Sequence, residues 1–280
     1  MNRLQAFGSI VAQAAKGELR FPTSINAALK LQMALADPDC HIDEAIKLVL
    51  GDPVLAARTV ALANSAMFGR RRGGVVTSVR AAVGLMGYRN LYTMVAAMVV
   101  RQFGSKIRDP DLRLKAELLW EHTAHVATLA HILARRVTLV DADTALFAGI
   151  VHEVSGFYLL ARADEFPGLL EDEESDNWAA AADELIKREI MKKLKVPEPV
   201  SSVVEAMRDS LLQIPPESLL DTMLLAKQLA PVLSPMQVGP PSIISYADSA
   251  IEFCIDRELL DSILQESADE VREMNAALLV

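Results

Sequence analysis

The chain has 280 residues, of which 51% are hydrophobic, 23% charged and only 5% aromatic. This length suits one large or two modest domains, and the apolar share is enough for a core built mainly from aliphatic side chains. The formal net charge of -9 argues against a general nucleic-acid binder, which needs an excess of Lys and Arg to displace counterions from phosphates.

The cysteines argue against a disulfide-bonded protein, and the apolar segments argue against a membrane-spanning or secreted one. Cys40 and Cys254 are far apart and form no CxxC pattern, so we expect no disulfide framework. The most apolar segment, "LYTMVAAMVV", is about half the length that a membrane span needs. The N-terminus lacks the apolar stretch of a signal peptide. We therefore expect a soluble, cytoplasmic protein without a cofactor, which contacts neither nucleic acid nor membrane.

Helical spacing of apolar residues recurs through the first half, with Pro and Gly at the breaks. Asp43 is expected to cap the second helix, and Asp52 followed by Pro53 is a strong start signal for the third. Thr77 or Ser78 is expected to cap the fourth, which Gly87 closes. The predicted helices cover about residues 24–35, 44–50, 54–68, 79–86 and 88–103.

The second half follows the same pattern, and no segment shows the alternation of a strand. Its predicted helices cover about residues 112–137, 141–163, 178–195, 198–212, 216–233, 242–254 and 257–278. The polar connection "SKIRDPD" is the best candidate for a boundary between subdomains. We predict an all-α protein with an N-terminal extension over 1–17, a helical subdomain over 18–105 and a second helical subdomain over 106–280.

Two of the five histidines are predicted to face the core. On a helical wheel, His122 lies on the apolar stripe of its helix, His125 lies at the edge, and His131 points to solvent. His41 lies in a turn. His152 follows His122 by 30 residues, the length of one helical hairpin, which could bring the two imidazoles together. Each is then either a buried histidine hydrogen-bonded to the backbone or to the other, or part of a metal site.

Two sets of motifs resemble known families. "AGIVHEVSG" resembles the "GLLHDIG" motif of the HD superfamily of metal-dependent phosphohydrolases. "FPTSINAALKL", "LVLGDPVLAARTVALANSAMFG" and "VTSVRAAVGLMGYRNL" resemble HDOD domains, the HD-related output domains of bacterial signalling proteins. The resemblance starts near residue 18 and implies an HDOD-like multi-helix bundle with a C-terminal HD-like subdomain. The signature residues are Asp52, Pro53, Asn64, Ser65, Gly69, Ser78 and Gly87.

The resemblance also implies an eroded metal site. His122 takes the position of the first metal-binding histidine, His152 that of the histidine in the His-Asp pair, and Glu153 that of its aspartate. Met207 and Arg208 stand where many HDOD sequences carry two histidines, and no distal aspartate is identified. HDOD domains are similar in fold to the enzymes but are regarded as regulatory. We therefore expect no catalytic residue and no bound metal.

Other residues offer different functions. Arg70, Arg71 and Arg72, flanked by glycines, are either a solvated loop tip or a contact for an anion or a partner. Asn64 and Ser65 are expected to hold the loop and the next helix in place, or else to contact a ligand.

The function that the sequence favours is a non-catalytic bacterial signal-transduction module acting through protein–protein contacts. Its expected partners are signalling proteins, with a second copy of the chain as a further candidate. The alternatives are a divergent metal-dependent phosphohydrolase or phosphodiesterase that uses His122, His152 and Glu153, and a nucleotide-sensing module that uses the loop of Arg70, Arg71 and Arg72.

Overall fold

The computed structural model describes residues 3–19, 26–65, 75–166, 169–170, 177–236 and 255–279, and these ranges contain helices and no strand. The first half contains α1 (Arg3–Ala15), α2 (Asn26–Leu35), α3 (Ile42–Leu50), α4 (Pro53–Ala63) and α6 (Val79–Phe103). The second half contains α7 (Pro110–Leu133), α8 (Ala142–Val151), α9 (Val154–Ala163), α10 (Asn177–Lys193), α11 (Glu198–Ala206), α12 (Leu219–Leu229) and α14 (Arg257–Leu279). The predicted all-α class is confirmed.

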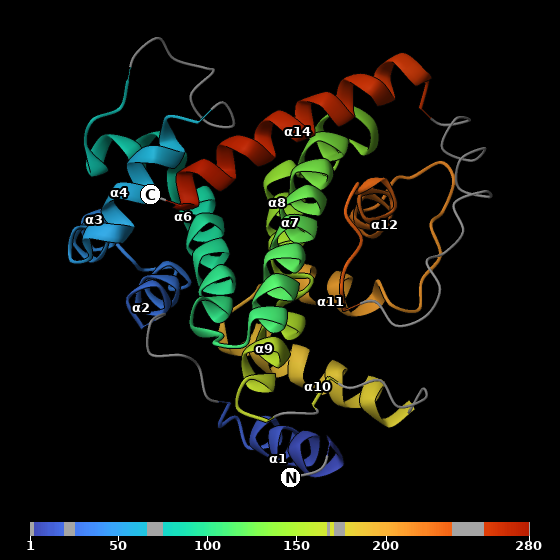
Figure 1. The fold of residues 1–280 in the computed structure, drawn as a ribbon. Helices are drawn as coiled ribbons and strands as arrows, with labels where there is room; N and C mark the ends of the chain where they lie inside the picture. The colour runs from blue at the N-terminus through green and yellow to red at the C-terminus, as the bar shows by residue number, and fades with distance from the viewer. Residues whose placement is uncertain are drawn as a thin grey trace.

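Helix α7 lies at the centre of the fold, where α8, α12 and α14 pack against it (Figure 1). Helix α6 packs against α2 and α4 on one side and α8 on the other, so it joins the first half to the second. Helix α14 crosses α7 and reaches α4, while α1 packs on α10 at the opposite end of the molecule. One continuous apolar core therefore runs through both halves.

Local sequence signals explain several of the helix ends. The Asp52 side chain accepts hydrogen bonds from the backbone N–H groups of Val54 and Leu55 at 2.9 and 3.0 Å, which caps α4 as predicted. Ser78 caps α6 through Ala81 N. Gly87 has φ 73°, a left-handed conformation that glycine adopts without strain, and it breaks α6 where the sequence predicts a helix end.

The structure corrects some predicted boundaries. The ring nitrogen Nδ1 of His41 accepts from Asp43 N, so His41 and not Asp43 caps α3. Helix α4 ends at Ala63, earlier than predicted, and α11 ends at Ala206. The predicted helix over residues 242–254 lies outside the described residues. The predicted helix over 141–163 is interrupted: α8 ends at Val151 and α9 begins at Val154.

Two helical stretches, Val79–Lys106 and Ala142–Ala163, have the length and apolar composition of a membrane span. The first includes α6 and the second joins α8 to α9. In the most apolar 18-residue window of each stretch, 61% and 83% respectively is buried inside the protein. Packing within this fold therefore accounts for their apolar character.

Candidate functional site

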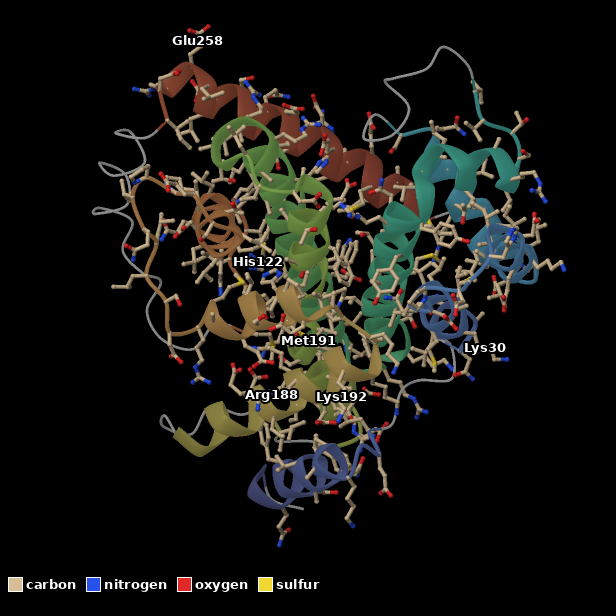
Figure 2. The ribbon with its side chains drawn as sticks, turned by 180° about the vertical axis from the view of Figure 1, so that it is seen from behind. Lys30, His122, Arg188, Met191, Lys192 and Glu258 are labelled. Atoms are coloured by element: carbon tan, nitrogen blue, oxygen red, sulfur yellow. The ribbon has the colours of Figure 1, made fainter. Side chains whose placement is uncertain are left out.

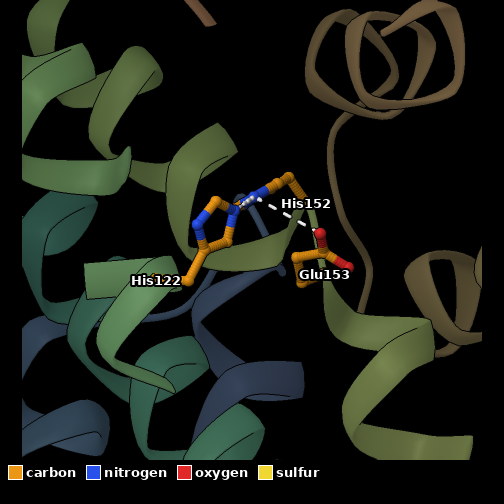
Figure 3. A group of neighbouring side chains, drawn as sticks. All are labelled: His122, His152 and Glu153. Carbon is orange, nitrogen blue, oxygen red and sulfur yellow. Dashed lines mark hydrogen bonds and ion pairs between the residues drawn. The ribbon is translucent and has the colours of Figure 1, made fainter. Parts of the chain in front are cut away.

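The packing of α7 on α8 brings His122 and His152 together. Gly149 lies so close to α7 that an added Cβ would stand 2.3 Å from the Cα of Ala127, so only glycine fits there. His122 lies on α7 and His152 follows the end of α8. Their Nε2 atoms are 3.4 Å apart, and both side chains are buried (Figure 3). Figure 2 shows His122 in the middle of the molecule, whereas Glu258 lies at an outer edge.

Backbone carbonyls fix the orientation of both rings. His122 Nδ1 lies 2.7 Å from Val232 O, and His152 Nδ1 lies 2.7 Å from Gly149 O. A carbonyl oxygen only accepts hydrogen bonds, so each Nδ1 carries the hydrogen. In the neutral rings each Nε2 is then a lone-pair acceptor, and the two lone pairs face each other. This orientation is typical of imidazoles that bind a metal through Nε2.

Glu153 is the third member of the group. It stands at the break between α8 and α9, and its Oε1 lies 4.0 Å from His152 Nε2. One donor atom from each of His122, His152 and Glu153 lies within 4.8 Å of the others. The structure thus brings together the three residues that the sequence analysis identifies as a vestigial HD-like site.

The geometry of the site suits a metal ion, whereas the charges around the site oppose one. Two imidazole nitrogens on one tetrahedral zinc ion lie about 3.4 Å apart, and two histidines with one glutamate are a known zinc ligand set. However, no further carboxylate, imidazole or thiolate joins the group among the residues that the structure describes. The donors fit part of a metal centre, and the oxygen-rich set expected for an HD phosphohydrolase is incomplete here.

Nearby positive charges oppose a cation. Burial lowers the pKa of His152 well below its usual value, and the charges of His122, Lys227 and Lys187 lower it further. Burial also lowers the pKa of His122, with Lys227 acting in the same direction and Glu153 opposing it. Both imidazoles are therefore neutral near pH 7. The charge of Lys227 repels a divalent ion, whereas the charge of Lys187 is offset by its ion pairs with Asp183 and Glu184, at 3.7 and 2.9 Å. Neither lysine is a site residue predicted from the sequence, because each lies on a helix remote from the motif.

Among the HDOD signature residues, Asp52, Asn64 and Ser78 make side-chain hydrogen bonds to the backbone, whereas the buried Ser65 Oγ has no hydrogen-bond partner in the described part of the chain. The Asn64 side chain donates to Val60 O and Val76 O and accepts from Val76 N, all within 2.9 Å, so it holds the chain that leads into α6. Ser65 is buried. None of these contacts lies at the histidine pair. Gly69 and the arginines Arg70, Arg71 and Arg72 lie outside the described residues.

The structure corrects the prediction for His131 and places Met207 and Arg208 away from the group of His122, His152 and Glu153. His131, predicted to face solvent, is buried and lies 3.4 Å from the Glu270 carboxylate of α14. The wheel for α7 was wrong there because it could not include a helix that packs on the second face. Arg208 lies 3.9 Å from the Glu184 carboxylate of α10, and Met207 is partly buried beside it. Neither contributes a metal ligand to the group.

Comparisons with known proteins establish the family and the fold of the chain. The family model of the HDOD domain matches residues 21–193. A "putative metal-dependent phosphohydrolase" from Shewanella amazonensis SB2B superposes with a TM-score of 0.68 at 18% identity, over 99% of both chains. An HDOD domain protein of unknown function from Geobacter sulfurreducens gives 0.61 at 21% identity over 97% of both chains.

A third solved structure has the same fold but is named for a different function. A "putative signal transduction protein" from Marinobacter aquaeolei VT8 gives a TM-score of 0.60 at 17% identity, over 99% of this chain and 65% of that chain. No curated protein matches the sequence. At these identities the structural similarities establish the fold and leave the chemistry to the site itself.

Proposed function

Since the chain belongs to the HDOD domain family, we propose that it is a non-catalytic bacterial signalling module that acts through contacts with other proteins. The observation that carries the proposal is the charge balance of the pocket. His122 and His152 are neutral and buried, Glu153 is the only carboxylate in the group among the described residues, and the positive charge of Lys227 acts on both histidines. Such a pocket is poorly suited to hold and activate a hydrolytic metal ion.

The other properties that we propose for the module rest on the composition and motifs of the sequence. The module works in the cytoplasm, needs no cofactor and binds neither nucleic acid nor membrane. Its partners are signalling proteins or a second copy of the chain. One similar structure carries a signal-transduction name, which supports this class of function.

The test is metal content combined with activity. The purified full chain is incubated with Zn²⁺, Mn²⁺ or Fe²⁺, desalted and analysed for bound metal, and then assayed with phosphomonoesters, phosphodiesters and nucleotides. The expected result is far less than one metal ion per chain and no turnover above that of the His152→Ala variant. Stoichiometric metal together with turnover that His152→Ala abolishes would replace the proposal.

A metal-dependent phosphohydrolase is the second candidate, and one specific observation favours it. Both Nδ1 atoms donate to backbone carbonyls, so both Nε2 lone pairs converge as they do around a bound ion. A second variant, Lys227→Met, tests whether charge repulsion keeps a metal ion out of the site. Lys227→Met removes a nearby positive charge, so it should raise the metal affinity of the pocket if charge repulsion is what excludes the ion there. An unchanged metal affinity in Lys227→Met would mean that Lys227 is too far from the histidines to affect metal binding.

A further inference from the structure

Residues 231–236, which follow α12 and form neither a helix nor a strand, lie against the histidine group. We call this segment the strap. Val232 O accepts the hydrogen bond from His122 Nδ1 at 2.7 Å, so one edge of that ring faces the strap. Ser234, two residues further on, is buried. His122 itself is only 2% exposed, so the strap helps to separate its ring from solvent.

The far end of the strap packs on α9. Met236 occupies the space that the missing side chain of Gly156 leaves, because a Cβ at Gly156 would lie 3.0 Å from Met236 Cγ. The same point lies 3.4 Å from Glu153 Oε2. The strap thus reaches the histidine group at two places, at His122 on α7 and beside Glu153 at the start of α9.

Few bonds hold the strap in this position. In the described part of the chain, the contact of Val232 O with His122 is the only hydrogen bond between the strap and other residues. Met236 N donates to Ser234 Oγ at 3.2 Å, which is a bond within the strap. Two residues of the strap are prolines, which have no N–H to donate. Segments with so few hydrogen bonds open at a small cost in free energy.

The two histidines differ in how their rings are held. His152 Nδ1 donates to Gly149 O, which belongs to the helix that His152 itself ends, α8. His122 Nδ1 donates to a carbonyl that lies 110 residues away in the chain. Movement of the strap therefore frees the ring of His122 and leaves the ring of His152 with its acceptor.

We propose that the strap is a gate for the histidine group. It is closed in this structure, and it opens by moving away from α7 and α9, which breaks the bond between His122 and Val232 and exposes the His122 ring to solvent. A ligand of the group enters only when the strap is open, and a protein that binds one position of the strap shifts the balance between the two. The gate goes beyond the proposed function and does not depend on it, since it acts whether or not the group binds a metal.

Access to His122 is measured with diethyl pyrocarbonate, which modifies neutral imidazoles that solvent reaches. The full chain is treated at pH 7, and the modification rate of each histidine is followed by mass spectrometry of its peptides. Met236→Ala removes the contact with α9 and should raise the rate at His122 by about 10-fold. Leu233→Ala changes an exposed side chain of the same strap and should leave that rate as it is in the wild type.

Two other histidines serve as references in every sample. His41 is exposed and should react at the same rate in all variants. His131 lies on α7 like His122, but α14 buries it, so its rate rises only if the fold opens more widely. An unchanged rate at His122 in Met236→Ala, or an equal rise at His122 and His131, would overturn the gate.

The tautomers of the two rings give a second readout, by ¹⁵N NMR of the histidine side chains. In the wild type both rings should carry the hydrogen on Nδ1. In Met236→Ala the ring nitrogens of His122 should shift toward the average of the two tautomers, while those of His152 should not. Identical spectra of His122 in the two proteins, or equal shifts at both histidines, would also contradict the proposal.

Discussion

Asp221 shows at the residue scale how a buried carboxylate is kept ionised. Its Oδ2 accepts from Ser218 N and Ser218 Oγ, and its Oδ1 accepts from Gln213 N, which completes a capping box at the start of α12. Burial alone would raise the pKa of Asp221, but the hydrogen bonds from Ser218 and Gln213 outweigh it and leave the pKa below its usual value.

This shift gives a pH-dependent prediction. A lowered pKa in the folded state means that Asp221 contributes stability above its unfolded pKa of about 3.9 and loses it as pH falls through the folded value. Asp221→Asn should cost about 1–3 kcal/mol at pH 7, because an amide N–H₂ then faces a backbone donor.

Urea unfolding of both proteins at pH 7, 4 and 3 measures this effect, and the difference between them should shrink below pH 4. Asp209→Asn, at an exposed position on the same connection, is the matched control and should change little. A difference that is independent of pH would show that packing, and not the charge of Asp221, matters there.

At the scale of elements, the contact between α7 and α8 decides the geometry of the histidine pair. The backbone of α8 at Gly149 approaches Ala127 so closely that a Cβ would lie 2.8 Å from Ala127 Cβ. Gly149→Ala should therefore push the helices apart and cost about 1–3 kcal/mol or more. It should also separate the imidazoles, since His152 follows Gly149 by less than one turn.

Gly84→Ala is the matched control for this helix contact. Gly84 lies on the exposed face of α6 with nothing within 4 Å of an added Cβ, so alanine should stabilise the helix by about 0.5–1 kcal/mol. Thermal unfolding of both variants measures the contrast. Equal effects of the two substitutions would mean that α7 and α8 can separate without cost.

At the scale of the whole molecule, α14 is held on α7 by polar pairs set within an apolar seam. Thr128 Oγ1 lies 2.8 Å from Ser267 Oγ, and Arg136, in the turn that follows α7, donates to Glu266 at 3.1 Å. Among the described residues, the most buried contact between an imidazole and a carboxylate is that of His131 with Glu270, whose side chains are 9% and 4% exposed. These pairs fix the register in which α14 crosses the bundle and covers α4 and α7.

Replacing one partner of the buried pair should be far worse than replacing both. His131→Leu alone leaves the Glu270 carboxylate buried without that partner and should cost about 3–5 kcal/mol. His131→Leu with Glu270→Leu should cost much less, because no buried charge remains. A double-mutant cycle by urea unfolding measures the coupling. Gln265→Ala, on the exposed face of α14, should lie within about 0.5 kcal/mol of the wild type. Additive single effects would show that the two residues act independently.

The sequence alone determined the features that depend on local chemistry. The apolar period of 3.6 residues predicts the helices, Asp52 with Pro53 and Ser78 predict two of their starts, and Gly87 predicts the break in α6. The motif around His152 and Glu153 predicts which side chains form the candidate site. These signals succeed because a cap, a turn or a helix face is formed by residues within a few positions of one another.

Only the tertiary structure decided what depends on partners remote in the chain. The periodicity predicts one helix over 141–163, and the structure divides it at His152 and Glu153, whose side chains lie in one group with His122 (Figure 3). The charges of Lys187 on α10 and Lys227 on α12 lower the pKa of His152, and α14 buries His131. The burial of a side chain and the charges that act on it depend on every helix that packs around it. The sequence of one helix alone therefore cannot predict them.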